Sequence, residues 1–341
     1  YGAIAERMYS QVNKALGILC CLALLPALSG CGEGAGGENE EAVLTEDGLY
    51  FDTAISITVA AGSQEEGQAV LDGCMELCQE IENTFSRTSP DSELYRVNHR
   101  ETDTVEISDE LAEVIAFGLE FYEISGGRLD ITIAPVLELW NFTDGTAELP
   151  DETALQEAVS RVDASSVHLD GNTLTFDRED TELDLGALAK GYAADRLKAW
   201  LEEQGIGSAL INLGGNVHTV GNRPDGSPWR VGIQVPFADR GVTDRVIEVS
   251  GQSVVSSGIY ERYFELDGII YHHVLDPDTG YPVENGLAQV TVVSDNSLLG
   301  DALSTTCLLL GREQAEEMLQ SFPEVEVFFE EMQDLSDTES L

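Results

Sequence analysis

Apolar side chains recur at helical spacing in five segments of the chain. In residues 66–85 the apolar stripe includes Cys74 and Cys78, four positions apart. Residues 109–125 repeat the pattern, and Gly126 and Gly127 then supply a stop signal. The remaining three predicted helices cover residues 151–162, 297–310 and 312–320. Cys74 and Cys78, and Cys307 in the fourth helix, are expected to pack in the core and to form neither a metal site nor a disulfide.

Elsewhere the apolar residues alternate with a period of two, which predicts strands. Turn residues lie between paired runs at Asp170–Asn172, at Gly214–Gly215 and at Asp267–Gly268, so each of these is expected to be a hairpin or a sharp strand connection. Predicted strands also cover residues 49–60, 182–185, 229–236, 287–293 and 324–329, and a helix that ends at Gly205 follows residues 182–185. Because helices and strands follow in irregular order, without a run of βαβ units, the predicted class is α+β.

The N-terminal segment has the pattern of an export signal. Lys14 precedes an apolar run from Ala15 to Leu28, and the run ends in small residues. The ending "LSGC" resembles a bacterial lipobox, which predicts lipidation of Cys31. We therefore expect a signal peptide with upstream residues at 1–30, a lipidated cysteine and flexible acidic tether at 31–48, and a folded domain at 49–335. An ordinary signal with chance cysteines is the alternative.

Charge excludes one class of partner. The chain has 17 Lys and Arg against 63 Asp and Glu, a formal charge of -46, so it would repel a nucleic-acid backbone. An anionic substrate would meet the same field unless a divalent cation or local basic groups reversed it. The motifs of P-loop NTPases, Rossmann dinucleotide sites, HExxH metalloproteases and paired CxxC zinc sites are absent.

Two segments could carry the chemistry of a metal and a phosphate. In "GDALSTTCLLLG", Asp301 and Thr305 are four residues apart on one helix face, with Ser304 beside them, and such hard oxygen ligands suit Mg²⁺. The alternative is a helix-dipole and back-bonding role for the same side chains. In "DLGALAKGYAADRL", Lys190 lies among glycines that would allow close approach of a phosphate, or equally of a packed helix. The glycine pair in "INLGGNV" is either a tight bulge or a backbone that faces a cofactor.

The segment "HHVLDPDTGYPV" adds a candidate base. His272 and His273 end a predicted strand, so their side chains point to opposite faces and only one can serve a given site. Histidine suits general-base work near neutrality, although a structural role is the commoner one. Asp276–Gly280 has the residues of a turn.

Together these segments, with "DSELYRVN", "LDITIAPVLELWNF" and "SGIYERYF", resemble the ApbE family of FAD:protein FMN transferases. The resemblance covers residues 49 to 329. It implies an α+β, ApbE-like (T-fold-like) fold of mixed sheets with flanking helices, in one large catalytic domain. It also implies an enzyme that uses Mg²⁺ and FAD, transfers FMN to a threonine hydroxyl of another protein and releases AMP.

The resemblance also assigns roles to individual residues. The metal would be held by Ala187 (through its carbonyl), Asp301 and Thr305, with Ser304 beside them. FAD would be contacted by Phe51, Thr88, Arg128, Leu129, Asp130, Asp184, Lys190 and Val274. His273 is the candidate base, with Asp276 to orient it. Phe51, Thr88 and Arg128 depart from the family's usual methionine, aromatic and small residue, which puts the flavin contacts in question.

Two other functions use the same features. An FAD pyrophosphatase would cut FAD to FMN and AMP with water at the same site. A non-enzymatic flavin-binding lipoprotein would show no metal-dependent AMP release, and such solute binders usually have two regular βαβ lobes, which this pattern lacks. For the transferase, the expected acceptors are extracytoplasmic flavoproteins such as Rnf- or Nqr-type subunits. The expected location is the outer face of the bacterial cytoplasmic membrane, through the lipid anchor.

Overall fold

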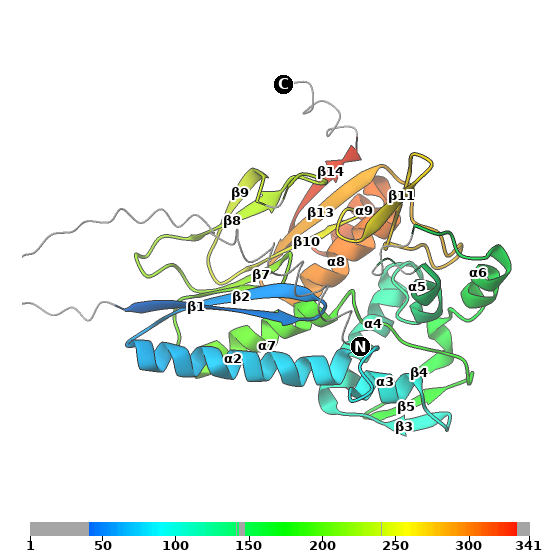
Figure 1. The fold of residues 1–341 in the computed structure, drawn as a ribbon, viewed down its shortest axis with the longest axis horizontal. Coiled ribbons are helices and arrows are strands. Elements are labelled where there is room, and N and C mark those ends of the chain that lie inside the picture. The colour runs from blue at the N-terminus through cyan, green and yellow to red at the C-terminus, as the bar shows by residue number, and fades with distance from the viewer. Residues whose placement is uncertain (1–40, 141, 143–146, 240, 333–341) are drawn as a thin grey trace, which may run out of the picture. The chain divides into compact units, whose positions relative to one another are not determined.

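The computed structural model of the chain describes residues 41–140, 142, 147–239 and 241–332, which belong to one compact unit (Figure 1). Its centre is a seven-stranded sheet with the order β1-β2-β6-β7-β10-β13-β14, in which each neighbouring pair is antiparallel. The strands are β1 (Ala42–Tyr50), β2 (Thr53–Ala61), β6 (Ala209–Asn212), β7 (Asn216–Val220), β10 (Ser253–Gly258), β13 (Leu287–Ser294) and β14 (Glu326–Glu331).

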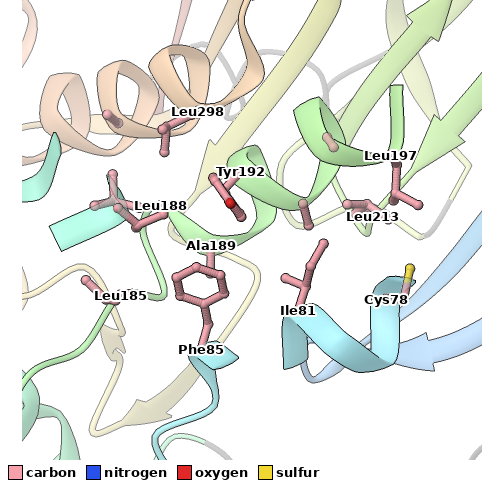
Figure 2. Packing of buried hydrophobic residues seen from close by; sticks show 14 of the residues in the cluster. Cys78, Ile81, Phe85, Leu185, Leu188, Ala189, Tyr192, Leu197, Leu213 and Leu298 are labelled. Atoms are coloured by element: carbon pink, nitrogen blue, oxygen red, sulfur yellow. The ribbon is translucent and has the colours of Figure 1, made fainter. Parts of the chain in front are cut away.

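Three helices pack on this sheet. Helix α2 (Gln64–Phe85) contacts β1 and β2, α7 (Ala189–Glu203) contacts β7, and α8 (Ser297–Leu310) contacts β10 and β13 (Figure 1). Figure 2 shows side chains of α2 and α7 facing one another, and the rings of Phe85 and Tyr192 meet at 5.2 Å between centroids. Burial of these apolar faces is the main stabilising contribution to the fold.

Smaller elements surround this layer. Strands β3 (Thr104–Glu106), β5 (Thr173–Phe176) and β4 (Val167–Asp170) form a separate three-stranded sheet. Two further ribbons pair β8 (Trp229–Gln234) with β9 (Thr243–Val249) and β11 (Tyr263–Leu266) with β12 (Ile269–His272). The remaining helices are α3 (Glu93–Asn98), α4 (Asp109–Ile124), α5 (Ala134–Trp140), α6 (Glu152–Val159) and α9 (Arg312–Met318), with short 3₁₀ turns at Ala164–Ser166 and Leu319–Ser321.

The predicted elements are found with a few differences. The α+β class, the six predicted helices and the three expected connections are confirmed, and the three cysteines within the described residues are buried and free. The run 49–60 is not one strand, because Phe51 and Asp52 adopt positive φ values of 55° and 57° and turn β1 into β2. Residues 182–185 are irregular.

The fold also begins earlier than expected. Strand β1 starts at Ala42, inside the segment predicted to be a tether, because its backbone pairs with β2 along its whole length and alternate side chains are partly buried. The predicted signal segment and Cys31 lie outside the described residues. Among those that are described, no helix is long and apolar enough to cross a membrane.

Candidate active site

The three residues predicted to form an oxygen cluster, Asp301, Ser304 and Thr305, lie together on α8. Asp301 and Thr305 are one turn apart, and the Ser304 hydroxyl donates to the Asp301 carbonyl at 3.0 Å. Strand β10 adds Ser257, whose Oγ lies 2.8 Å from Ser304 Oγ and 3.4 Å from Thr305 Oγ1. Sequence reasoning did not find Ser257, since only the packing of α8 on the sheet brings β10 beside it.

Burial makes the Asp301 carboxylate sensitive to nearby charge. The residue is 3% exposed, and loss of hydration raises its pKa to about 6, while Lys190 and the Gly191 amide act in the opposite direction. The Gly191 N–H donates to Asp301 Oδ2 at 2.8 Å. A cation next to this carboxylate would offset the cost of burying its charge.

The donor set suits magnesium better than a transition metal. No group of three His, Cys, Asp or Glu side chains forms a metal site in the described part of the chain. The candidate donors on α8 are one carboxylate and the hydroxyls of Ser304 and Thr305, and Ala187, which is predicted to add its carbonyl, lies in the turn that precedes α7. Mg²⁺ is commonly held by one or two carboxylates, with water and substrate phosphates as its other ligands. The residues therefore fit this ion.

Lys190 and Asp184 flank the turn that leads into α7. Asp184 is not a free carboxylate: its Oδ2 forms an ion pair with Arg87 Nε at 2.9 Å, and its Oδ1 accepts from the Gly186 amide at 2.9 Å. Arg87 also contacts Glu138 at 3.1 Å, so it joins the end of α2 to α5 and to this turn. Arg87 was not predicted; its only sequence signal is its position next to Thr88.

Arg128 and Asp276 meet, but not in the predicted arrangement. Arg128 Nη1 lies 2.7 Å from Asp276 Oδ2 and 3.1 Å from Asp278 Oδ2. The other oxygen of Asp276 accepts from the amides of Asp278 and Thr279 within its own turn. The carboxylate therefore holds Arg128 and the turn, and the hydrogen bonds give no support to its expected role of orienting His273.

A hollow of about 470 Å³ opens beside this ion pair. Its lining includes Arg128, Asp276 and Tyr281, together with Leu309 and Leu310 at the C-terminal end of α8. Asp301 does not line it. The hollow thus borders two of the predicted residues and is separate from the oxygen cluster.

Three of the predicted FAD contacts, Leu129, Asp130 and Val274, are buried among other residues of the protein. Leu129 and Val274 are buried in the hydrophobic core, so a ligand could meet them only through their backbone. The buried Asp130 accepts from the Thr132 amide and hydroxyl and from the Ala164 amide, and burial raises its pKa. Its carboxylate organises a loop.

Phe51 and Thr88, two further predicted FAD contacts, lie before and after α2 in the chain. The Phe51 amide donates to Glu82 Oε1 at 2.9 Å, which ties the β1–β2 turn to α2. Thr88 Oγ1 is 3.4 Å from Ser86 Oγ.

The two histidines differ in access, as their strand positions predict. His272 is 4% exposed, its Nε2 lies 3.1 Å from the Val283 carbonyl, and burial lowers its pKa to about 4. His273 is half-buried, and its Nδ1 lies 3.2 Å from the Arg262 carbonyl. Loss of hydration, followed by the charge of Arg262, lowers the pKa of His273 to about 3. An Nδ1–H that donates to this carbonyl leaves the lone pair of the neutral ring on Nε2.

The glycine pair is a tight turn. Gly214 and Gly215 adopt φ values of 68° and 100° between β6 and β7, and a Cβ on Gly214 would lie 2.2 Å from Thr53 Oγ1. The turn interpretation accounts for both glycines.

A model of the ApbE family matches residues 51–329, and so covers all of the predicted site. The chain belongs to the ApbE family. Among curated relatives, a FAD:protein FMN transferase of Klebsiella pneumoniae (strain 342) is 34% identical over 77% of this chain and 82% of its own. A FAD:protein FMN transferase of Treponema pallidum (strain Nichols) is 32% identical over 94% of this chain and 91% of its own.

Solved structures of the family share the fold. The apo flavinyl transferase ApbE of Pseudomonas stutzeri superposes with a TM-score of 0.74 at 28% identity, covering 85% of this chain and 91% of that one. The ApbE protein of Thermotoga maritima gives 0.76 at 28% identity, covering 84% and 94%. The predicted ApbE-like α+β fold is confirmed, and since the curated relatives are transferases, so is the prediction of a transferase enzyme.

Proposed function

We propose that the chain is a Mg²⁺-dependent FAD:protein FMN transferase. It attaches FMN through a phosphoester bond to a threonine hydroxyl of an extracytoplasmic flavoprotein and releases AMP. The observation that carries the proposal is the buried Asp301 carboxylate, aligned with Thr305 and beside Lys190, in a chain whose family includes transferases of this name.

The proposed reaction breaks one bond and forms one. The oxygen of the acceptor threonine attacks the phosphorus of the FMN half, the pyrophosphate bond to AMP breaks, and AMP leaves with the bridging oxygen. Bound Mg²⁺ would neutralise the charge of the pyrophosphate. Phosphoryl transfer of this kind depends mainly on positioning and electrostatic stabilisation.

The chain's residues supply the rest. Asp301, Ser304, Thr305 and the Ala187 carbonyl would hold the metal. Lys190 would add a positive charge near the phosphates, which matters in a chain with a net charge of -46. His273 Nε2 would accept the threonine proton, because the ring is neutral and Nδ1 is held by the Arg262 carbonyl.

One experiment separates the transferase from the alternatives. The purified full chain is incubated with FAD and an Rnf- or Nqr-type acceptor subunit, with MgCl₂ or with excess EDTA. AMP is quantified by chromatography, and flavin on the acceptor by fluorescence of the denatured band. We expect both products with Mg²⁺, neither with EDTA, and a loss of at least about 100-fold for Asp301→Asn. Asp72→Asn, on α2, is the control and should keep full activity.

Each other outcome has a distinct meaning. AMP without a fluorescent acceptor would indicate the FAD pyrophosphatase. FAD binding without AMP would indicate a flavin-binding lipoprotein. Equal rates with EDTA, or with Asp301→Asn, would overturn the proposed metal site.

We also propose that the chain is exported and lipid-anchored through Cys31 on the outer face of the cytoplasmic membrane. The support is the lipobox-like "LSGC" after an apolar run. Cells expressing the chain would be labelled with a radioactive fatty acid. The wild-type chain should carry label and fractionate with membranes, and Cys31→Ser should do neither; label retained by Cys31→Ser would rule out this anchor.

A further inference from the structure

Helices α7 and α8 each cap the other's first turn through an aspartate. The carboxylate of Asp195, on α7, accepts from the Ser297 amide at 2.8 Å and from the Leu298 amide at 2.9 Å, at the start of α8. In return, Asp301 of α8 accepts from the Gly191 amide in the first turn of α7. The capping is therefore reciprocal.

Both caps satisfy donors that would otherwise lack partners. The first N–H groups of a helix have no acceptor within the helix. Ser297 and Leu298 are buried, so water cannot easily replace Asp195, and the next amide, of Leu299, bonds to Asn296. At α7, the side chain of the N-cap residue Leu188 has no hydrogen-bond acceptor, so Asp301 supplies one.

The spacing makes the two caps depend on each other. Gly191 and Asp195 are four residues apart on α7, and Ser297 and Asp301 are four residues apart on α8, so each pair lies along one helix face. Asp195 fixes where α8 begins, and that position sets where Asp301 meets the Gly191 amide. Of the two Asp301 oxygens, only Oδ2 has a hydrogen bond from the described residues, which leaves Oδ1 to a further ligand.

A buried histidine on β7 lies next to Asp195. His218 is fully buried, and its Nε2 lies 3.2 Å from Asp195 Oδ1, although the two atoms do not have hydrogen-bond geometry. Its Nδ1 accepts from the Thr219 amide at 3.0 Å. Asn216, on the same strand, accepts from the Ser297 hydroxyl at 2.7 Å.

We propose that Asp195 is a positioning residue for the metal-binding carboxylate of Asp301. It acts by fixing the start of α8 against α7 and touches neither substrate nor metal. The inference rests on the proposed function, since it assumes that Asp301 holds Mg²⁺. Side chains that orient metal ligands typically contribute about 10- to 100-fold in metal affinity.

The test compares Asp195→Ala with Asp151→Ala in the full chain. Asp151 is a matched control: its carboxylate also accepts from two amides, those of Thr153 and Ala154, at the start of α6 and outside the oxygen cluster. Mg²⁺ affinity is measured without FAD, by calorimetric titration at a temperature at which all variants are folded. Hydrogen exchange is followed by mass spectrometry in peptides that contain Gly191 and Ser297–Asp301.

We expect Asp195→Ala to bind Mg²⁺ at least about tenfold more weakly than wild type and Asp151→Ala to bind it as wild type does. Exchange should rise at Gly191 as well as at Ser297–Asp301, because loss of one cap loosens the other. Asp195→Asn keeps one acceptor oxygen and should recover part of the affinity. It also replaces Asp195→Ala in the test if that variant does not fold.

The results that contradict the positioning role can be told apart from those that contradict the proposed function. Wild-type affinity in both Asp195 variants, or faster exchange confined to Ser297–Asp301, would overturn the positioning role and leave the proposed function intact. Equal losses in Asp195→Ala and Asp151→Ala would show that Asp195 affects stability alone. A wild-type chain that binds no Mg²⁺ would overturn the metal assignment and this inference together.

Discussion

Arg128 Nη1 lies 2.7 Å from Asp276 Oδ2, which joins the glycine turn after α4 to the turn at Asp276–Gly280. A second carboxylate, Asp278, approaches the same nitrogen at 3.1 Å. One guanidinium therefore compensates two negative charges at the edge of the hollow.

We expect Arg128→Ala to raise the KM for FAD about fivefold, equivalent to about 1 kcal/mol, and to leave kcat within about twofold. Without the guanidinium, two uncompensated carboxylates would repel the negatively charged FAD. The cost in stability should stay below about 1 kcal/mol, because Arg128 and Asp278 are partly solvated. Steady-state AMP release measures both constants. Arg178→Ala, which breaks a surface pair with Asp180, is the control; the same KM in both variants would contradict the prediction.

Asp301→Asn should inactivate the enzyme and yet stabilise the metal-free chain at neutral pH. The carboxyl's pKa is raised from 3.8 to about 6 in the folded state, so the folded state binds the proton more tightly. Its ionisation therefore lowers the free energy of unfolding as pH rises from about 4 to about 6, by at most about 3 kcal/mol. The amide removes this penalty, and its oxygen can still accept from Gly191.

Urea unfolding with EDTA at pH 4 and pH 7.5 measures this effect. The free energy of unfolding of Asp301→Asn should exceed that of wild type at pH 7.5 and differ little from it at pH 4. Adding Mg²⁺ should stabilise wild type alone, since only wild type has the carboxylate that binds the ion. If Asp301→Asn were less stable than wild type at pH 7.5, loss of hydration would not be the main effect on the free energy of the Asp301 carboxylate.

The sequence predicts those elements whose own side chains repeat a pattern. Helix α2 shows its stripe because Val70, Leu71 and Ile81 all face the core. Strand β1 does not stand out, because its apolar residues do not keep to one face: Val43 and Leu49 are exposed, whereas Glu46 is on the partly buried face. Strand β10 is a Ser- and Val-rich run whose serines find partners on other elements, such as Ser304 on α8, so nothing local marks it as a central strand.

The candidate site likewise contains residues that the sequence brings together and residues that only the fold brings together. Asp301, Ser304 and Thr305 share one helix, so their spacing alone brings them together. Ser257 meets Ser304 only through packing, across 47 residues of chain, and Asp195 meets the start of α8 across 102 and 103 residues. Asp276 is the opposite case: it is close to His273 in sequence, but its carboxylate forms an ion pair with Arg128.

His273 should remain neutral throughout the working range of the enzyme. Since its pKa is lowered to about 3, it stays unprotonated above about pH 4 and should add no acidic limb to the rate between pH 6 and 8. We expect His273→Gln to lower the single-turnover rate of flavin transfer about 100-fold without changing Mg²⁺ affinity. His168→Gln, on the surface, is the control. A limb near pH 6.5 that disappears in His273→Gln would contradict this protonation state.

The close crossing of α7 and α8 makes a single methyl group damaging at Gly191. A Cβ there would lie 2.5 Å from the Ser297 carbonyl oxygen and 2.7 Å from Leu298 Cα, which are backbone atoms and cannot rotate away. Gly191→Ala should therefore push α8 from α7, cost about 1–3 kcal/mol in urea unfolding and weaken Mg²⁺ binding in calorimetric titration.

Gly207→Ala is the matched control, because a Cβ at Gly207 has no heavy atom within 4 Å. Gly207→Ala should leave Mg²⁺ affinity unchanged and should alter the free energy of unfolding only slightly, because alanine reduces the conformational entropy of the unfolded chain. If Gly191→Ala lost stability but kept wild-type Mg²⁺ affinity, the helix crossing would support the fold without setting the position of Asp301. If both quantities fell together while Gly207→Ala stayed at wild type, the contact between α7 and α8 would set the geometry of the metal site.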